Sequence, residues 1–455
     1  MLKKILIIAT SFFTIWPLAG LTIILLILIG GEFMRVNLGE LNFPLTDFLM
    51  PLFFAIWIFK KIRFGWQPTQ QIKKILIPFS AFTIWALITL LANASFFSTK
   101  EILISSFYWI RWVTYASIFF IIADELNLFL LTQKPKNWTS IIQKILLGSF
   151  VFAVLIGFLQ FYFFTDFEAL GLADQGYDPH MNRLAGAWLD PNLAGAFFLI
   201  GIIWLTNLIL DIFASYNSKL TTYNLQLKIK KLLPITYYLL PTCLLTLALG
   251  LTFSRSAYLA FLVACFLIGL IRARKILLIG FLSIILLLTF SSRALERTTD
   301  LVQSITTLFS GEDAYFLPDA TARLRIQNWE DNLNLVAKQP IFGIGYNTLR
   351  FVSRNSSDGH AAGGTDSSLL TILVTTGIPG LILFFWFLET LFLIFWQNWK
   401  KFKSTPALTV LISWSAILVH SFFTNSLFFP PILFLLFLFS GLGIASASKK
   451  NLPNI

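Results

Sequence analysis

The chain has 455 residues, of which 57% are hydrophobic and 12% are charged, and it contains 49 Phe and 14 Trp. A soluble protein has about 45–50% apolar and about 25% charged residues, so this composition excludes a soluble globular protein. The formal net charge of +12 does not indicate nucleic acid here, because it must first be divided between the two sides of a membrane.

Apolar runs predict an all-α polytopic membrane protein, because about 20 residues of helix cross the hydrocarbon of a bilayer. The two shortest runs are separated only by Arg272 to Lys275, so a re-entrant pair is the alternative to two spans there. The first run continues well beyond the core of a signal peptide, which favours a retained helix. We expect about twelve spans, at residues 5–30, 43–59, 75–96, 102–123, 145–164, 191–212, 234–252, 257–271, 276–290, 367–396, 406–424 and 428–446.

Basic residues in the short loops predict the orientation of these spans, because Lys and Arg are enriched in cytoplasmic loops. They fall in the even-numbered gaps, on the side of both termini, which we therefore place in the cytoplasm. In the expected external segments lysine occurs only at Lys100 and Lys338. The basic residues are Lys60, Lys61, Arg63, Lys73, Lys74, Lys134, Lys136, Lys144, Lys219, Lys228, Lys230, Lys231, Arg272, Arg274, Lys275, Lys400, Lys401 and Lys403.

Two external segments interrupt this single integral membrane domain of residues 1–455: a short loop at 165–190 and a long loop at 291–366, between spans nine and ten. Long loops frequently carry function, so we expect the active site there. Within the long loop, apolar residues at helical spacing predict an amphipathic helix over Ala322 to Ala337. Arg325 is in line with the apolar stripe, so it points to the protein interior or snorkels to lipid headgroups.

Arg255 lies between Ser254 and Ser256 in the short hairpin between spans seven and eight. A charge at this position is costly unless it binds an anion or reaches water. Arg183 is a further external cation, and the following Asp190-Pro191 pair is typical of a helix start.

The end of the long loop holds two candidate proton acceptors. Asp366 is either the N-cap of span ten or a reactive carboxylate, and His360 is either an external acid or base or a solvated loop histidine.

The sequence has no Walker A motif, no dinucleotide fingerprint and no His/Cys cluster with ligand spacing, and Cys243 and Cys265 fall inside spans. We therefore expect no metal and no cofactor. Any chemistry must then draw its energy from an activated substrate.

The ordered landmarks resemble the O-antigen ligase and polymerase family over residues 180–385. The matching pieces are RLAGAWLDPN at 183–192, LTFSRSAYLA at 251–260, Arg325 through the GIG of 343–345, and TDSSLLTILVTTGIPG at 365–380. The resemblance implies a metal-independent, inverting glycosyltransferase of cell-envelope polysaccharide or lipopolysaccharide synthesis, in the bacterial cytoplasmic membrane. Its donor would be a glycan on undecaprenyl pyrophosphate at the external (periplasmic) face. The acceptor would be a glycan, a lipid-core sugar or a protein, and we favour polymerisation.

The resemblance implies that Arg255 and Arg325 grip the pyrophosphate. Arg183, as a further external cation, is an additional candidate for this contact. The chain departs from the family at the base, where members usually have His-Asn and this sequence has Asp366-Ser367. Asp366 is then the base, with His360 as an orienting or alternative base; the remaining possibility is lost activity.

The rival hypothesis is a flippase for lipid-linked oligosaccharides, or another transporter of about twelve helices. Transporters commonly show two similar halves, whereas the long loop at 291–366 has no counterpart in the first half. Few charges inside the spans also favour the enzyme.

Overall fold

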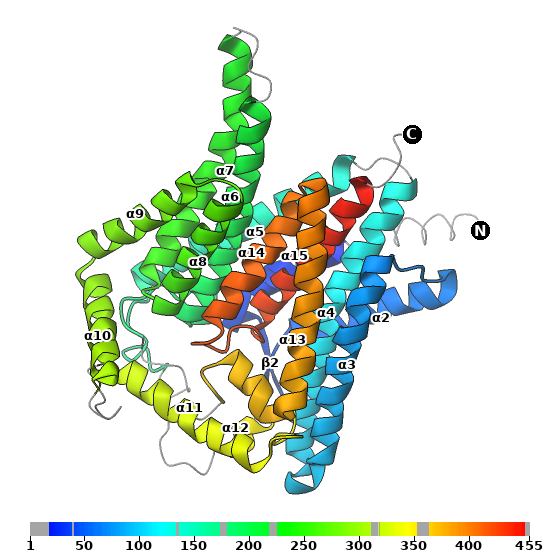
Figure 1. Cartoon of the computed structure of the whole chain (residues 1–455), viewed down its shortest axis with the longest axis vertical. Coiled ribbons are helices and arrows are strands. Elements are labelled where there is room, and N and C mark those ends of the chain that lie inside the picture. The colour runs from blue at the N-terminus through cyan, green and yellow to red at the C-terminus, as the bar shows by residue number, and fades with distance from the viewer. Residues whose placement is uncertain are drawn as a thin grey trace.

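The structure is a computed structural model, and it is a bundle of helices that is capped at one end by a second group of helices (Figure 1). The residues that it describes are 18–38, 41–132, 136–172, 180–217, 225–310, 317, 319–352 and 364–450. The bundle consists of α2 (Thr46–Phe64), α3 (Gln70–Ala92), α4 (Thr99–Thr132), α5 (Lys136–Phe163), α6 (Pro191–Asn217), α7 (Leu225–Leu251), α8 (Arg255–Ile271), α9 (Lys275–Phe290), α13 (Ser368–Phe402), α14 (Thr405–His420) and α15 (Pro430–Lys450).

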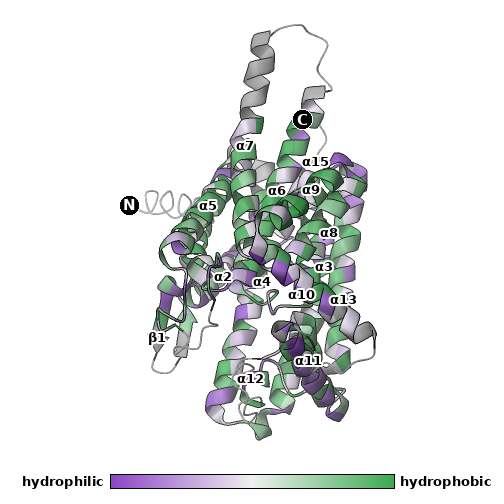
Figure 2. Ribbon diagram, turned by 90° about the vertical axis from the view of Figure 1, so that its left-hand side faces the viewer, coloured by the Kyte–Doolittle hydropathy of each residue, from purple (hydrophilic) through white to green (hydrophobic). Residues whose placement is uncertain are grey.

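The capping group comes from the long loop between the ninth and tenth expected spans. It contains α10 (Ser292–Phe309), α11 (Ala320–Lys338) and the short α12 (Leu349–Val352). The amphipathic helix expected at 322–337 is confirmed as α11. Figure 2 shows α11 largely in the hydrophilic colour, in contrast to the mainly hydrophobic bundle.

The expected membrane helices are present, although fewer are long enough to cross a bilayer than the sequence suggested. Six helices among the described residues pass a test of length and apolar composition, and a bent pair, Lys275–Phe290 with Ser292–Ser304 at 106°, makes a seventh if it is one span. Four other apolar helices are shorter: Leu18–Met34, Ile235–Leu251, Arg255–Ile271 and Thr405–His420. A predominantly helical membrane protein is confirmed, and the count of twelve crossings stays a prediction.

Polar contacts join several of the expected cytoplasmic gaps at the end of the bundle opposite α10–α12. Lys60 Nζ lies 2.6 Å from Glu125 Oε2, which ties α2 to α4. Arg272 donates to the carbonyl oxygen of Asn207 over 2.8 Å, and its guanidinium lies 6.0 Å from the Trp399 ring centroid. These contacts support one common face for these basic gaps, while the assignment of that face to the cytoplasm stays a prediction.

The core of the bundle is a network of interlocked aromatic rings between α3, α4, α13, α14 and α15. Trp112, for example, packs against Phe82 at 5.5 Å and Phe437 at 5.6 Å between ring centroids, and Phe437 contacts Trp414 at 5.6 Å. Rings of this size bury large apolar areas and fix the helices that carry the site relative to one another.

A two-stranded hairpin corrects the expectation of an all-α chain. Strands β1 (Arg35–Leu38) and β2 (Leu41–Pro44) pair antiparallel, with Val36 opposite Phe43. The second expected span, 43–59, therefore begins as a strand, and its helix α2 starts only at Thr46. The apolar residues before Thr46 alternate with polar ones, which is the pattern of a strand.

A break in α13 joins two of the motifs that carry the family resemblance. Gly377 has φ +69° inside α13, and the amide of the following Ile378 donates to the carbonyl of Pro340 over 2.8 Å. The amide of Ile344 in turn donates to Val374 over 2.9 Å. A Cβ atom on Gly377 would lie 2.1 Å from the carbonyl oxygen of Ile341, so only glycine permits this approach. The contact seats the end of α11 on the bundle.

Candidate functional site

The candidate site lies where α10 and α11 meet the ends of α6, α8 and α13. Arg255 is the first residue of α8, and the hydroxyl of Ser254 before it caps the helix by accepting the amide of Ala257. Because Arg255 is the first residue of α8, its side chain lies at the end of the bundle next to α10 and α11. Its Nη1 forms an ion pair with Asp319 and donates to the carbonyl oxygen of Arg297 over 3.2 Å.

Arg325 reaches the same region from α11, on the interior-facing side that its position in the apolar stripe predicted. Its Nε lies 3.6 Å from Oδ2 of Asp366, and this nitrogen is buried without a hydrogen bond among the described residues. Burial lowers the pKa of Arg325, and the neighbouring Asp366 carboxylate opposes that shift. An arginine guanidinium keeps its charge in proteins, and the Nε without a hydrogen bond in the described ranges leaves capacity for an anion.

Asp366 is the residue just before the helix cap, so its alternative as an N-cap is wrong. Ser367 caps α13 instead, because its hydroxyl accepts the amide of Leu370. The Asp366 side chain is 53% exposed, and its amide donates to the Asn328 side chain over 3.2 Å. The carboxylate is thus held beside Arg325 and open to solvent. His360, the other expected base, lies outside the described residues.

Arg183 is buried against the turn that precedes Arg255. Its Nε donates to the carbonyl of Thr252 over 2.9 Å, and its Nη2 lies 3.4 Å from both the Phe253 carbonyl and the Asn192 side chain. Burial first, and then the charge of Arg297, lower the pKa of Arg183 to about 9. Its donors are mostly occupied by protein atoms. Asp190 caps α6 as expected, accepting the amide of Asn192 over 2.7 Å.

Sequence reasoning missed several residues of the site. Arg293 and Arg297 are four residues apart on one face of α10, and Arg297 interacts electrostatically with Arg255, Asp319 and Arg293. The Nε of Arg297 is buried without a hydrogen bond among the described residues. The spacing of the two arginines was the available signal. Asp319 gave no such signal in the sequence, because only the fold brings it to Arg255.

A buried polar network supports the site from within the bundle. The hydroxyl of Ser254 donates to Asn192 over 2.7 Å, and that of Ser256 lies 3.2 Å from Nε2 of His420. The other ring nitrogen of His420 lies 2.9 Å from the Ser426 hydroxyl. The network joins the ends of α6, α8 and α14, and so it fixes Arg255 relative to the bundle.

The arrangement is a cluster of guanidinium groups at one end of a helical membrane protein, which makes it a candidate anion-binding site. Guanidinium groups from three elements converge there: Arg255 from α8, Arg297 from α10 and Arg325 from α11. Guanidinium forks bind phosphate oxygens bidentately and keep their charge, so this group of cations suits a phosphate or pyrophosphate ligand.

Residues 240–385 match the family model described as O-antigen ligase, which confirms the resemblance seen in the sequence. This segment is therefore similar to the O-antigen ligase family, and it holds Arg255, Arg325 and Asp366. The family implies a glycosyltransferase-like enzyme that acts as a membrane glycan ligase or polymerase. No curated protein matches the chain.

Proposed function

We propose that the protein transfers a glycan from undecaprenyl pyrophosphate to an acceptor hydroxyl at the external face of the bacterial cytoplasmic membrane. The observation that carries the proposal is that Arg255 and Arg325 are close enough to interact electrostatically, with Arg325 beside Asp366. These residues come from separate segments of the matched domain, and each guanidinium faces a carboxylate that an anionic substrate would displace or share.

On this proposal the pyrophosphate of the donor binds between Arg255 and Arg325, with Arg297 as a third cation. As the bond between the anomeric carbon and the phosphate oxygen breaks, negative charge grows on the leaving undecaprenyl pyrophosphate. Guanidinium groups fixed in advance stabilise that charge, which is the electrostatic part of the catalysis. The Nε atoms of Arg297 and Arg325 are buried and have no hydrogen bond within the described part of the chain, so they are the donors best placed to respond.

Asp366 acts as the general base in this scheme. Its carboxylate takes the proton of the acceptor hydroxyl as that oxygen attacks the anomeric carbon from the side opposite to the leaving group, so the configuration is inverted. The exposure of Asp366 leaves room for an acceptor, and pyrophosphate that draws Arg325 to itself would free the carboxylate.

Arg183 is a positioning residue on this proposal. Its bonds to the carbonyls of Thr252 and Phe253 hold the turn that presents Arg255, and few of its donors remain for the substrate. This differs from the direct contact with the pyrophosphate that we expected for Arg183 from the sequence.

The proposal is tested with Arg255→Ala and Arg325→Ala in cells that make the polymer. Each change should abolish polymer formation while the protein still inserts and accumulates, because the leaving group loses a charge-assisted contact. Lys338→Ala removes an exposed cation at the end of α11 and should leave the polymer normal. Normal polymer in either arginine variant would overturn the proposal.

A further inference from the structure

A second polar feature reaches the first turns of α13 and takes no part in the chemistry described above. It is a cavity of about 210 Å³, lined by residues of the segment Leu18–Met34 and the hairpin after it, of α4 and α13, and of the connection between α14 and α15. Apolar and aromatic side chains form much of its wall, including Leu28 and Trp188, and polar side chains from α4, α13 and the region of α12 complete it.

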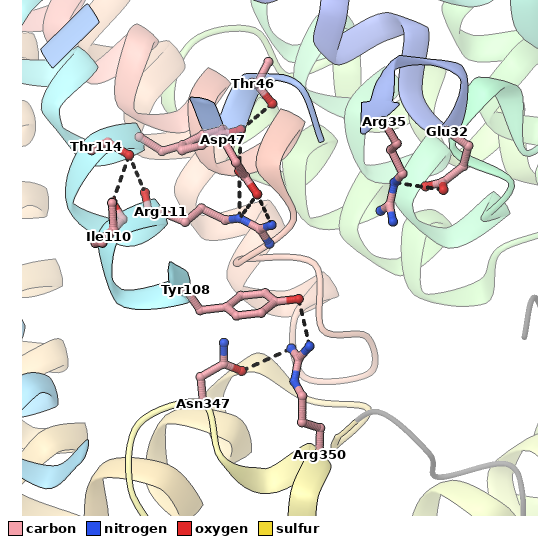
Figure 3. Close-up of polar contacts among 11 residues, drawn as sticks. Glu32, Arg35, Thr46, Asp47, Tyr108, Ile110, Arg111, Thr114, Asn347 and Arg350 are labelled. Atoms are coloured by element: carbon pink, nitrogen blue, oxygen red, sulfur yellow. Dashed lines mark hydrogen bonds and ion pairs between the residues drawn. The ribbon is translucent and has the colours of Figure 1, made fainter. Parts of the chain in front are cut away.

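The cations of this cavity are not equivalent. Arg111 is paired with Asp47, over 2.9 Å from Nε to Oδ1, and Arg35 is paired with Glu32 over 2.9 Å. Figure 3 shows both pairs at one end of the view and Arg350 at the other. The charges of Arg35 and Arg111 are therefore compensated locally, and Arg350 has to be considered separately.

Of the three arginines that line the cavity, Arg350 is the one that has no carboxylate partner among the described residues. Its Nη1 donates to the Tyr108 hydroxyl over 2.8 Å, and its Nη2 lies 3.4 Å from the Asn347 side chain (Figure 3). Its Nε is buried without a hydrogen bond among the described residues. The guanidinium also stacks on Tyr108, 4.1 Å from the ring centroid, and Arg111 lies 4.4 Å from that centroid. Arg350 is thus a stiffly held cation in the wall of the cavity, and no carboxylate within the described ranges compensates its charge.

The side chains that line the cavity indicate the chemical class of ligand that it would bind. A single uncompensated guanidinium suits a ligand with one negative charge, and its planar fork suits a carboxylate. Asn347, Thr371, Thr375 and Asn425 offer donors and acceptors for hydroxyl groups, and Trp188 offers an apolar ring face. Hydroxyls, one carboxylate and an apolar ring face together describe an acidic sugar.

The cavity adjoins the proposed base. Asn425 lines the cavity, and its side chain accepts the hydroxyl of Ser368 over 3.0 Å, two residues after Asp366. Thr371 and Thr375, in the first turns of α13, also line the cavity. A glycan held here would thus approach Asp366 from the bundle side, whereas the arginine site would take the donor pyrophosphate.

We propose that this cavity binds a carboxylated sugar of the acceptor glycan, and that Arg350 pairs with the carboxylate. The proposal rests on the proposed function and specifies its acceptor as an acidic glycan. A lipid-linked donor that placed its phosphate here would be a different assignment, and the experiment below separates the two.

The first measurement is binding without donor, so it does not depend on turnover. Purified protein in nanodiscs is titrated calorimetrically with a trisaccharide that ends in glucuronic acid and with the matched trisaccharide that ends in glucose. A charged hydrogen-bonded pair predicts at least about tenfold tighter binding of the acidic ligand. Arg350→Gln should abolish that preference, Arg350→Lys should keep part of it, and Lys338→Ala should keep it all.

The second measurement is transfer to lipid-linked acceptors with the same two termini. Arg350→Gln should raise KM about tenfold for the acidic acceptor alone, with kcat and the donor KM unchanged. Equal binding of both trisaccharides by the wild type would overturn the proposal, and so would a raised donor KM in Arg350→Gln. If the acidic trisaccharide binds through Arg350 and no transfer occurs with any acceptor, the proposed function fails while the binding site stands.

Discussion

At the scale of single residues, the proposed role of Asp366 as the general base can be tested directly by substitution. Removal of a general base costs about 10²- to 10⁴-fold in rate, so Asp366→Asn should lower kcat by such a factor while the donor KM changes little. Asp331→Asn, an exposed carboxylate on α11, is the matched control and should be neutral. Full activity of Asp366→Asn would contradict this assignment, and His360→Ala should then be assayed as the alternative base.

The buried His180 predicts how the stability of the protein depends on pH. Burial and then the charge of Arg183 lower the pKa of His180 to about 3, from an ordinary value of 6.5. Between these two pH values the unfolded chain binds a proton that the folded chain does not, so stability is lost as the pH falls from 6.5 towards 3. The thermal midpoint in detergent should therefore fall between pH 7 and pH 5, and His180→Gln should reduce that fall. An identical pH dependence in the variant would contradict the burial of a neutral His180.

The sequence indicated some residues of the site and not others, for a physical reason. Arg255 and Arg325 stand out because charge is costly in an apolar hairpin and in an apolar stripe. Asp and Ser are equally good helix caps, so the sequence could not decide between Asp366 and Ser367. That choice depends on Arg325, which only the fold places 3.6 Å from Asp366. Arg297 and Asp319 join the site through the same tertiary packing.

At the scale of elements, the contact between the Pro340–Gly345 turn and the break in α13 should be essential for stability. Gly377→Ala would need φ +69° and would bring Cβ to 2.1 Å from the Ile341 carbonyl oxygen, so we expect a loss of at least about 1–3 kcal/mol. Gly148→Ala on α5 meets nothing within 4 Å and should be neutral or stabilising by about 1 kcal/mol. Thermal unfolding compares the two variants, and equal midpoints would contradict the tight contact.

The helices were predictable because length and apolar composition determine them locally. The break in α13 was not, although Gly377 and Pro379 lie in the expected span 367–396. Glycine and proline interrupt a membrane helix only where another segment satisfies the freed backbone groups, and here the Pro340 carbonyl does so from a distant part of the chain. The hairpin at β1 and β2 was missed because its short alternating pattern adjoins a longer apolar run.

At the scale of the whole molecule, the predicted orientation places Lys338 outside the cell and Lys401 in the cytoplasm. Single cysteines at these positions, in a chain with Cys243 and Cys265 changed to Ala, should react differently with an impermeant thiol reagent. The cysteine at 338 should be labelled in intact cells or spheroplasts, and that at 401 only after permeabilisation. The reverse pattern would invert the topology and move the site to the cytoplasmic face.

Transfer of a lipid-linked glycan is the reaction that we propose for this site. The most direct measurement incubates purified protein with a defined undecaprenyl-pyrophosphate oligosaccharide and a matching acceptor, followed by analysis of the products. We expect a longer glycan with an inverted new linkage, release of undecaprenyl pyrophosphate, and loss of both products in Arg255→Ala. Movement of the lipid-linked glycan across the membrane of a liposome without any elongation would contradict it.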